Sequence, residues 1–209
     1  MRTLIAVPCM DMVHTDFFRS CVGMEVSGEI QWTTCQSSLV YDARNTLTEI
    51  AINDGFDRVL WLDSDMIFDR YLLRRLSEHL DMGKEMVTAL CFSRKPPIRP
   101  VIYKEMSVDP ETGDPVSVSY LDYARDSLFE VAACGFAAVM TTTEMLRDVR
   151  TRYELPFYPA RGFGEDFAFC IRARQMGHRI WCDSSIKVGH VGTAVYNEEV
   201  WRKLQENKD

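Results

Sequence analysis

The chain has 209 residues, a length typical of one ordinary domain. Hydrophobic residues make up 46% of it and charged residues 26%, which is the composition of a folded globular protein and excludes a largely disordered one. The formal net charge of -7 disfavours nucleic-acid binding through bulk electrostatics, and the longest apolar runs, such as residues 136–140, are far shorter than the roughly 20 residues of a membrane-spanning helix.

The N-terminus and the cysteines indicate the compartment. Residues 3–7 form a short apolar run before Pro8 and lack the small-residue cleavage site of a signal peptide, so we expect them to form a first strand. The seven cysteines are odd in number and include no Cys-x-x-Cys spacing, which favours free thiols over disulfides or a zinc site. We therefore expect a reduced, cytoplasmic protein.

Residues 1–91 alternate between apolar runs and segments with helical periodicity. The predicted strands cover residues 3–7, 29–34, 57–62 and 85–91, and the predicted helices cover residues 13–24, 39–53 and 69–82. Asp69 is the expected N-cap of the third helix. This order predicts a mostly parallel, Rossmann-like α/β sheet with helices on both faces. Ligands bind such sheets beyond the carboxyl ends of the strands, so functional residues are expected just after Val7, Thr34, Leu62 and Cys91.

The second half of the chain follows a different pattern. A proline-rich basic loop covers residues 92–100. After it, strands are predicted at residues 101–103, 116–120, 128–132, 136–140 and 179–183, and helices at residues 143–150, 166–176 and 196–208. We expect one α/β domain to which this half adds antiparallel strands, rather than two independent domains.

An acidic pair directly follows the third predicted strand. Residues 60–66 read Leu-Trp-Leu-Asp-Ser-Asp-Met, so one residue separates Asp63 from Asp65. Side chains two residues apart in an extended strand point to the same side, and two neighbouring carboxylates repel each other unless a cation lies between them. Mg²⁺ and Mn²⁺ prefer carboxylate oxygens, so the pair predicts a divalent-metal site. The alternative is a polar turn in which Asp63 caps the next helix.

Several short motifs extend this prediction. They lie, in chain order, at residues 43–45, 59–66, 135–138, 164–166 and 189–190. Together they resemble the GT-A-type glycosyltransferases, most closely the family-2-like enzymes of bacteria and phages. The resemblance implies a GT-A fold and a metal-dependent enzyme that moves a sugar from a nucleoside-diphosphate sugar, by default a UDP-sugar, to a hydroxyl acceptor. It divides a single domain, 1–209, into a nucleotide-sugar-binding half at 1–91, an acceptor and catalytic half at 92–195, and a C-terminal helix at 196–209.

The same resemblance implies a set of metal ligands. Asp65 would ligate Mn²⁺ or Mg²⁺ directly, Asp63 would contact the ribose or reach the metal through water, and His190 would be a further ligand. The metal would neutralise the charge that develops on the departing nucleoside diphosphate. An alternative role for His190 is that of a structural histidine at the end of a strand.

Glu165 and Asp166 stand at the start of a predicted helix. Carboxylates are favoured there by the unpaired N–H groups and the helix dipole, which alone accounts for one of them. The resemblance implies that Asp166 is the general base of an inverting reaction, with Glu165 as the alternate. A retaining enzyme would need a different geometry.

The resemblance also implies donor contacts. The predicted donor-binding residues are Pro8, Cys9, Arg44, Asp63, Ser64, Gly135 and Phe136. Pro8 and Cys9 would line the nucleobase pocket through backbone groups, and the Arg44 guanidinium would reach the base or the phosphates. The alternative for Arg44 is a solvated side chain paired with Asp42 or Glu49.

Three further segments carry expectations, and two of them have an alternative interpretation. Gly135 allows a close approach to a sugar, but a tight turn before a strand explains it equally well. Residues 94–99 either clamp the diphosphate or close as a lid, or they form an ordinary solvated loop. The aromatic loop 157–163 is the expected acceptor site, because aromatic faces pack on sugar rings.

Two other functions remain open at this point. A sugar nucleotidyltransferase typically has glycines and a basic residue in its first βα turn, and residues 7–12 contain neither. A non-catalytic nucleotide-sugar or carbohydrate-binding module would bind without turnover. The acceptor is a glycan, a protein or a small molecule, and the acidic charge disfavours a nucleic acid. Little sequence follows His190, so we expect acceptor selection to come from a partner chain, a homodimer or residues 101–121.

Overall fold

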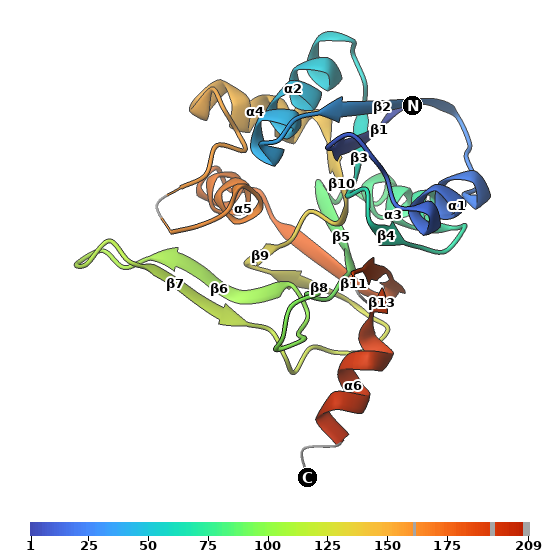
Figure 1. The fold of residues 1–209 in the computed structure, drawn as a ribbon. Helices are drawn as coiled ribbons and strands as arrows, with labels where there is room; N and C mark the ends of the chain where they lie inside the picture. The colour runs from blue at the N-terminus through green and yellow to red at the C-terminus, as the bar shows by residue number, and fades with distance from the viewer. Residues whose placement is uncertain (161, 193–194, 207–209) are drawn as a thin grey trace.

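The computed structural model of the chain describes residues 1–160, 162–192 and 195–206 (Figure 1). Its helices are α1 (Thr15–Gly23), α2 (Val40–Asn53), α3 (Leu72–Asp81), α4 (Thr143–Tyr153), α5 (Glu165–Gln175) and α6 (Glu198–Glu206). Its strands are β1 (Arg2–Cys9), β2 (Glu29–Gln36), β3 (Arg58–Leu62), β4 (Met66–Ile67), β5 (Met86–Leu90), β6 (Ile102–Val108), β7 (Pro115–Ser119), β8 (Leu128–Val131), β9 (Ala133–Cys134), β10 (Ala138–Thr142), β11 (Ile180–Lys187), β12 (Gly189–Val191) and β13 (Val195–Tyr196). Every strand and helix predicted for residues 1–91 is present, with ends that differ by a few residues.

A seven-stranded sheet with the order β2-β1-β3-β10-β5-β11-β8 forms the centre of the fold. Strands β1, β2, β3, β5 and β11 run in one direction, whereas β8 and β10 run in the opposite one. The predicted mostly parallel sheet is confirmed. Strand β10 lies between β3 and β5, with Ala138 opposite Leu62. Because β10 runs antiparallel to β3, the residues that precede it lie beyond the carboxyl end of β3.

Helices cover both faces of the sheet, as predicted (Figure 1). Helices α2, α4 and α5 pack on one face, where Leu47, Leu146 and Phe169 join the larger cluster of buried side chains. Helices α1 and α3 pack on the other face, where Phe17 and Leu76 join a second cluster. Within the described residues, no helix is long and apolar enough to cross a membrane.

The second half adds antiparallel strands to this layered core. Strand β6 pairs with β7 and β9, and the β6–β7 hairpin lies beside α5, where the centres of the Tyr103 and Phe167 rings are 4.9 Å apart (Figure 1). A separate small sheet has the order β13-β12-β4. The sequence did not predict this small sheet. It is important for the site, because it joins the segment after β3 to a segment near the end of the chain.

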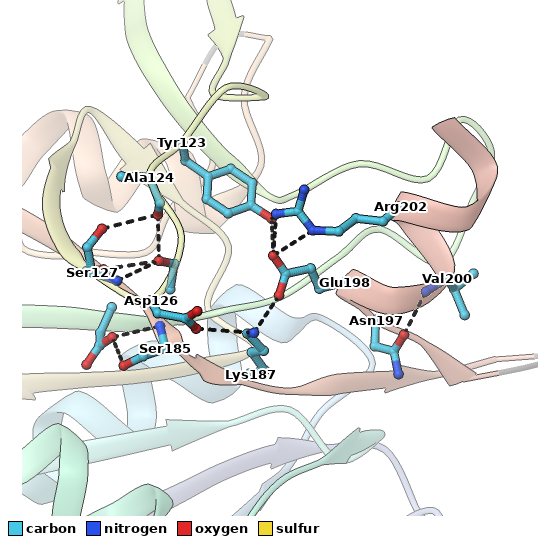
Figure 2. A network of polar contacts seen from close by, with 12 residues as sticks. Tyr123, Ala124, Asp126, Ser127, Ser185, Lys187, Asn197, Glu198, Val200 and Arg202 are labelled. Atoms are coloured by element: carbon cyan, nitrogen blue, oxygen red, sulfur yellow. Dashed lines mark hydrogen bonds and ion pairs between the residues drawn. The ribbon is translucent and has the colours of Figure 1, made fainter. Parts of the chain in front are cut away.

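Helix α6 is anchored by the buried carboxylate of Glu198. The Tyr123 hydroxyl donates to Glu198 Oε1 at 3.0 Å, and Lys187 Nζ lies 2.9 Å from Glu198 Oε2 (Figure 2). One turn further along the helix, the centre of the Trp201 ring lies 5.7 Å from the centre of the Phe92 ring. The helix therefore packs against the start of the loop that follows β5.

Most predicted helix ends differ from the observed ones by one to three residues, and two of these differences concern Asp69 and the C-terminal helix. The third helix begins at Leu72 rather than near Asp69, whose Oδ1 accepts a hydrogen bond from Tyr71 N at 2.8 Å in the preceding turn. The C-terminal helix predicted over 196–208 covers Glu198–Glu206. Residues 207–209 at its predicted end lie outside the described residues, as does Arg161 in the aromatic loop 157–163.

Candidate functional site

A cleft of about 410 Å³ lies beyond the carboxyl ends of the parallel strands. The segments that follow β1, β2, β3 and β5 all contribute to its lining, and α2 and the start of α5 supply further walls. This is the edge of the sheet at which the sequence predicts functional residues. Both Asp63 and Asp65 line the cleft.

The backbone of the acidic pair is fixed by two distant segments. Asp63 N donates to Ala137 O at 3.0 Å, just before β10, and Val191 N in β12 donates to Asp65 O at 2.8 Å. These bonds hold the chain between β3 and β4 and leave both carboxylates facing the cleft. Asp63 does not cap α3, which begins at Leu72.

Arg44 is a buried counter-charge for the acidic cleft. Its side chain is 2% exposed, its Nη2 donates to Asp63 Oδ1 at 2.8 Å, and its Nε lies 3.5 Å from Glu165 Oε1. The guanidinium lies 5.2 Å from the centre of the Phe136 ring. Nε and Nη1 have no hydrogen-bond partner in the described part of the chain. Burial raises the pKa of Asp63, an effect larger than the lowering by Arg44.

Asp65 meets a histidine and an arginine from two other segments. Strand β4 pairs with β12, which sets His190 opposite Met66 and hence beside Asp65. His190 Nε2 lies 3.3 Å from Asp65 Oδ2. Arg94, in the loop after β5, donates to the same carboxylate oxygen. His190 is therefore close to the acidic pair, as the resemblance implies.

The charges of this cluster shift the titration of its members. Burial by itself would raise the pKa of Asp65, but contacts with His190 and Arg94 outweigh it and lower that pKa. Burial likewise disfavours a charged His190, yet the Asp65 carboxylate raises the pKa of the imidazole above its ordinary value. At neutral pH the carboxylate is thus ionised, and its negative charge is shared between His190 and Arg94.

The donor atoms around Asp65 fit a divalent metal. His190 Nδ1 lies 3.1 Å from Phe92 O, an acceptor, so this nitrogen carries the hydrogen. In the neutral ring, Nε2 then directs its lone pair at the Asp65 carboxylate, and only a proton or a cation can lie between them. Metal-bound histidines commonly donate their other N–H to a backbone carbonyl in this way.

The protein supplies two such donors rather than a complete shell. Among the residues that the structure describes, no group of three or more His, Cys, Asp or Glu side chains could hold a metal. The pair fits a metal such as Mg²⁺ or Mn²⁺, which keeps water and substrate phosphates among its ligands.

A second acidic pair opens α5. Glu165 lines the cleft, and Asp166 follows it in the first helical turn, where Phe167 N donates to Asp166 Oδ1 at 2.8 Å. A Cβ atom at Gly135 would lie 3.0 Å from Val101 Cγ1, so the glycine allows the close packing of Val101, and it would lie at ordinary contact distance, 3.6 Å, from Asp166 Oδ2. Burial, followed by the Glu165 charge, raises the pKa of Asp166 to about 7. A carboxyl group with this pKa exchanges protons near neutral pH.

The other predicted site residues divide into two groups. Pro8, Cys9 and Ser64 line the cleft. Gly135 and Phe136 do not: Phe136 is 2% exposed and lies beneath Arg44, among the rings of the core.

The cleft also contains residues that the sequence interpretation missed. They are Met10, Ser37, Ser38 and Val40. Ser37 and Ser38 directly follow β2, so the rule that ligands bind at strand ends was sufficient to find them.

Comparisons with known proteins support the fold. The sequence matches no family model and none of the curated proteins. Among solved structures, A197 from STIV is similar with a TM-score of 0.63 and 19% identity, over 92% of this chain and 86% of that one. GalNAc-T7, solved with UDP, GalNAc and Mn²⁺, is similar with a TM-score of 0.63 and 10% identity, over 92% of this chain. The chain spans 44% of the length of GalNAc-T7. The expected GT-A-like fold is confirmed.

Proposed function

We propose that the protein is a family-2-like glycosyltransferase that moves a sugar from a nucleoside-diphosphate sugar, by default a UDP-sugar, to a hydroxyl group of a glycan, a protein or a small molecule. One observation carries the proposal: Asp63, Asp65 and Glu165 converge on a single cleft at the carboxyl edge of the sheet, beside Asp166. The similarity in fold to GalNAc-T7, which was solved with UDP, GalNAc and Mn²⁺, supports it.

The donor would lie along the cleft from β1 and β2 towards Asp65. The volume of about 410 Å³ is in the range of small-ligand sites. Backbone groups of Pro8 and Cys9 would face the nucleobase, and Ser64 would lie near the ribose. Arg44 acts through Asp63, because its guanidinium is buried against that carboxylate.

Other predicted donor contacts take supporting roles in this proposal. The Phe136 ring packs against the Arg44 guanidinium, and Gly135 lets Val101 pack closely next to Asp166. Both residues therefore shape the site without touching the donor.

Asp65 and His190 would hold Mn²⁺ or Mg²⁺, with Asp63 reaching the metal through water or binding the ribose. When bound, the metal would offset the negative charge that develops on the departing nucleoside diphosphate. The two protein ligands leave coordination positions for the donor's phosphate oxygens.

Asp166 would act as the general base of an inverting transfer. As the acceptor oxygen forms its bond to the anomeric carbon, the bond from that carbon to the diphosphate breaks, and the hydroxyl proton moves to the Asp166 carboxylate. Burial, and after it the Glu165 charge, keeps the pKa of Asp166 high, and Glu165 is the alternate base. A base with a pKa near the working pH suits this proton transfer.

The test is the rate at which the protein hydrolyses nucleotide sugars in the presence of Mn²⁺, with Asp166→Asn as the matched variant. We expect slow hydrolysis by the wild type, and loss of turnover without loss of UDP binding in the variant. Equal turnover by both proteins removes Asp166 from the base role. A binding module would bind UDP without hydrolysis, whereas a nucleotidyltransferase would release pyrophosphate from a nucleoside triphosphate.

The reaction would take place in the cytoplasm. The seven free cysteines support a reducing, cytoplasmic location. A homodimer or the β6–β7 hairpin would select the acceptor.

A further inference from the structure

A basic side chain already contacts the carboxylate that is proposed to bind the metal. Arg94 Nη1 donates to Asp65 Oδ2. The same oxygen lies 3.3 Å from His190 Nε2. A metal held by Asp65 and His190 would therefore need the position that the Arg94 guanidinium contacts in this structure.

The base of the loop that carries Arg94 is firmly closed. A bridge pairs Phe92 with Pro100. Ser93 N donates to Arg99 O at 2.9 Å, and Arg99 N donates to Ser93 Oγ at 3.1 Å. Arg94 directly follows Ser93. These bonds hold its backbone beside the cleft, so that the side chain can turn while the backbone stays in place.

The two basic side chains of the described cleft lining differ in their freedom to move. Arg44 is 2% exposed and packed against an aromatic ring, so it is a fixed charge. Arg94 is 48% exposed, and an ion pair with this exposure is weak and easily exchanged. Lys95 and Arg99, the other basic residues of the loop, do not line the cleft.

We propose that Arg94 is a diphosphate-binding residue that neutralises Asp65 in the free protein and moves to the donor's phosphates when a divalent cation takes its place. The inference rests on the proposed function, because it needs a diphosphate in the cleft. Two cations on one carboxylate oxygen repel each other, so the incoming metal releases the guanidinium. The released group remains within the cleft, and its planar N–H donors match the geometry of phosphate oxygens.

The exchange would have two consequences. In the absence of nucleotide, Arg94 competes with the metal and weakens metal binding. Once a diphosphate is present, the same arginine becomes a second positive group on it. Arg94 therefore makes metal binding and donor binding depend on each other, and it disfavours a metal site filled without substrate.

Calorimetric titration of Arg94→Met tests this role. Methionine keeps an unbranched apolar stem and removes the charge. Arg99→Met is the matched control, because it removes a charge from the same loop but outside the cleft lining. Each protein is titrated with Mn²⁺ alone, and then with UDP and with inorganic pyrophosphate at saturating Mn²⁺. Pyrophosphate makes the test independent of the nucleobase.

We expect Arg94→Met to bind Mn²⁺ alone about tenfold more tightly than the wild type, and both diphosphates about tenfold less tightly, as the removal of one neighbouring charge implies. Arg99→Met should behave as the wild type in all titrations. If the wild type binds UDP with Mn²⁺ and Arg94→Met matches it in every titration, the role of Arg94 is overturned and the proposed function stands. If the wild type binds neither diphosphate, the proposed function fails, and the role of Arg94 fails with it.

Discussion

Replacing Asp166 with asparagine should stabilise the fold while it abolishes sugar transfer. The Asp166 carboxylate is largely buried at the start of α5, beside Glu165, and these two features raise its pKa to about 7. At neutral and higher pH the folded protein must keep this group ionised in an unfavourable environment. Asparagine has nearly the same shape and no charge, so the variant removes that cost.

The free-energy cost of the ionised carboxylate follows from two pKa values: about 7 in the folded protein and the ordinary 3.8. Between these pH values the folded state holds a proton that the unfolded state has released, so the free energy of unfolding decreases as the pH rises. One pKa unit corresponds to about 1.4 kcal/mol, so the cost is about 4 kcal/mol at pH 8 and about 2 kcal/mol at pH 5.

Chemical denaturation at pH 5 and pH 8 measures this effect. We expect Asp166→Asn to raise the free energy of unfolding at both pH values, with a gain about 2 kcal/mol larger at pH 8. Asp11→Asn is the control, since Asp11 is exposed and its replacement should change stability by about 0.5 kcal/mol or less. Equal gains at both pH values, or a loss of stability at pH 8, would refute the reasoning.

Further predictions concern the base and helix α6. The value of kcat/KM should rise as the pH increases through about 7, because Asp166 accepts a proton only when it is ionised; a flat profile from pH 6 to 8 contradicts its role. Glu165→Gln should move the midpoint of this profile to lower pH, because it removes a charge that raises the pKa of Asp166, and an unmoved midpoint excludes that coupling. Glu198→Ala should lower the free energy of unfolding by about 2 kcal/mol, because the buried Tyr123 hydroxyl loses its acceptor and Lys187 loses its ion pair (Figure 2). Glu199→Ala, which alters an exposed ion pair on the same helix, should change it by about 0.5 kcal/mol or less, and equal losses in the two variants argue against an anchoring role for Glu198.

Local patterns predicted most of the sheet and the edge where the cleft lies. The short apolar run before Asp63 favours a buried strand, and β3 is buried along its whole length. Because parallel strands end at one edge, the sequence also predicted that residues after Val7 and Leu62 would lie together there. These conclusions needed only periodicity and the order of elements.

Pairings between distant segments could not be predicted in this way. The sequence interpretation placed no strand between β3 and β5, and β10 enters there from about 75 residues away in the sequence. The β4–β12 pairing, which sets His190 beside Asp65, likewise joins segments from the two halves of the chain. The register of strands that are far apart in the sequence depends on tertiary packing, which local sequence patterns do not reveal.

Arg44 and Phe136 illustrate a different limit. Arg44 shares the buried face of α2 with Thr48 and Ala51, at helical spacings of 4 and 3, so its burial could have been read from the sequence. Its partner could not, because Asp63 comes from a strand end. Phe136 follows a glycine in a motif that suggests ligand contact, but it fills the core beneath the guanidinium.

The central claim is that Asp65 and its neighbours hold a divalent cation that binds the donor's diphosphate. Calorimetric titration with UDP, in buffer containing Mn²⁺ and in metal-free buffer, tests it most directly, using the wild type, Asp65→Asn and the exposed control Asp11→Asn. The account predicts that Mn²⁺ strengthens UDP binding to the wild type and to the control, and that Asp65→Asn loses this gain while keeping its fold by circular dichroism. Equal affinity of the wild type for UDP with and without Mn²⁺ would contradict it.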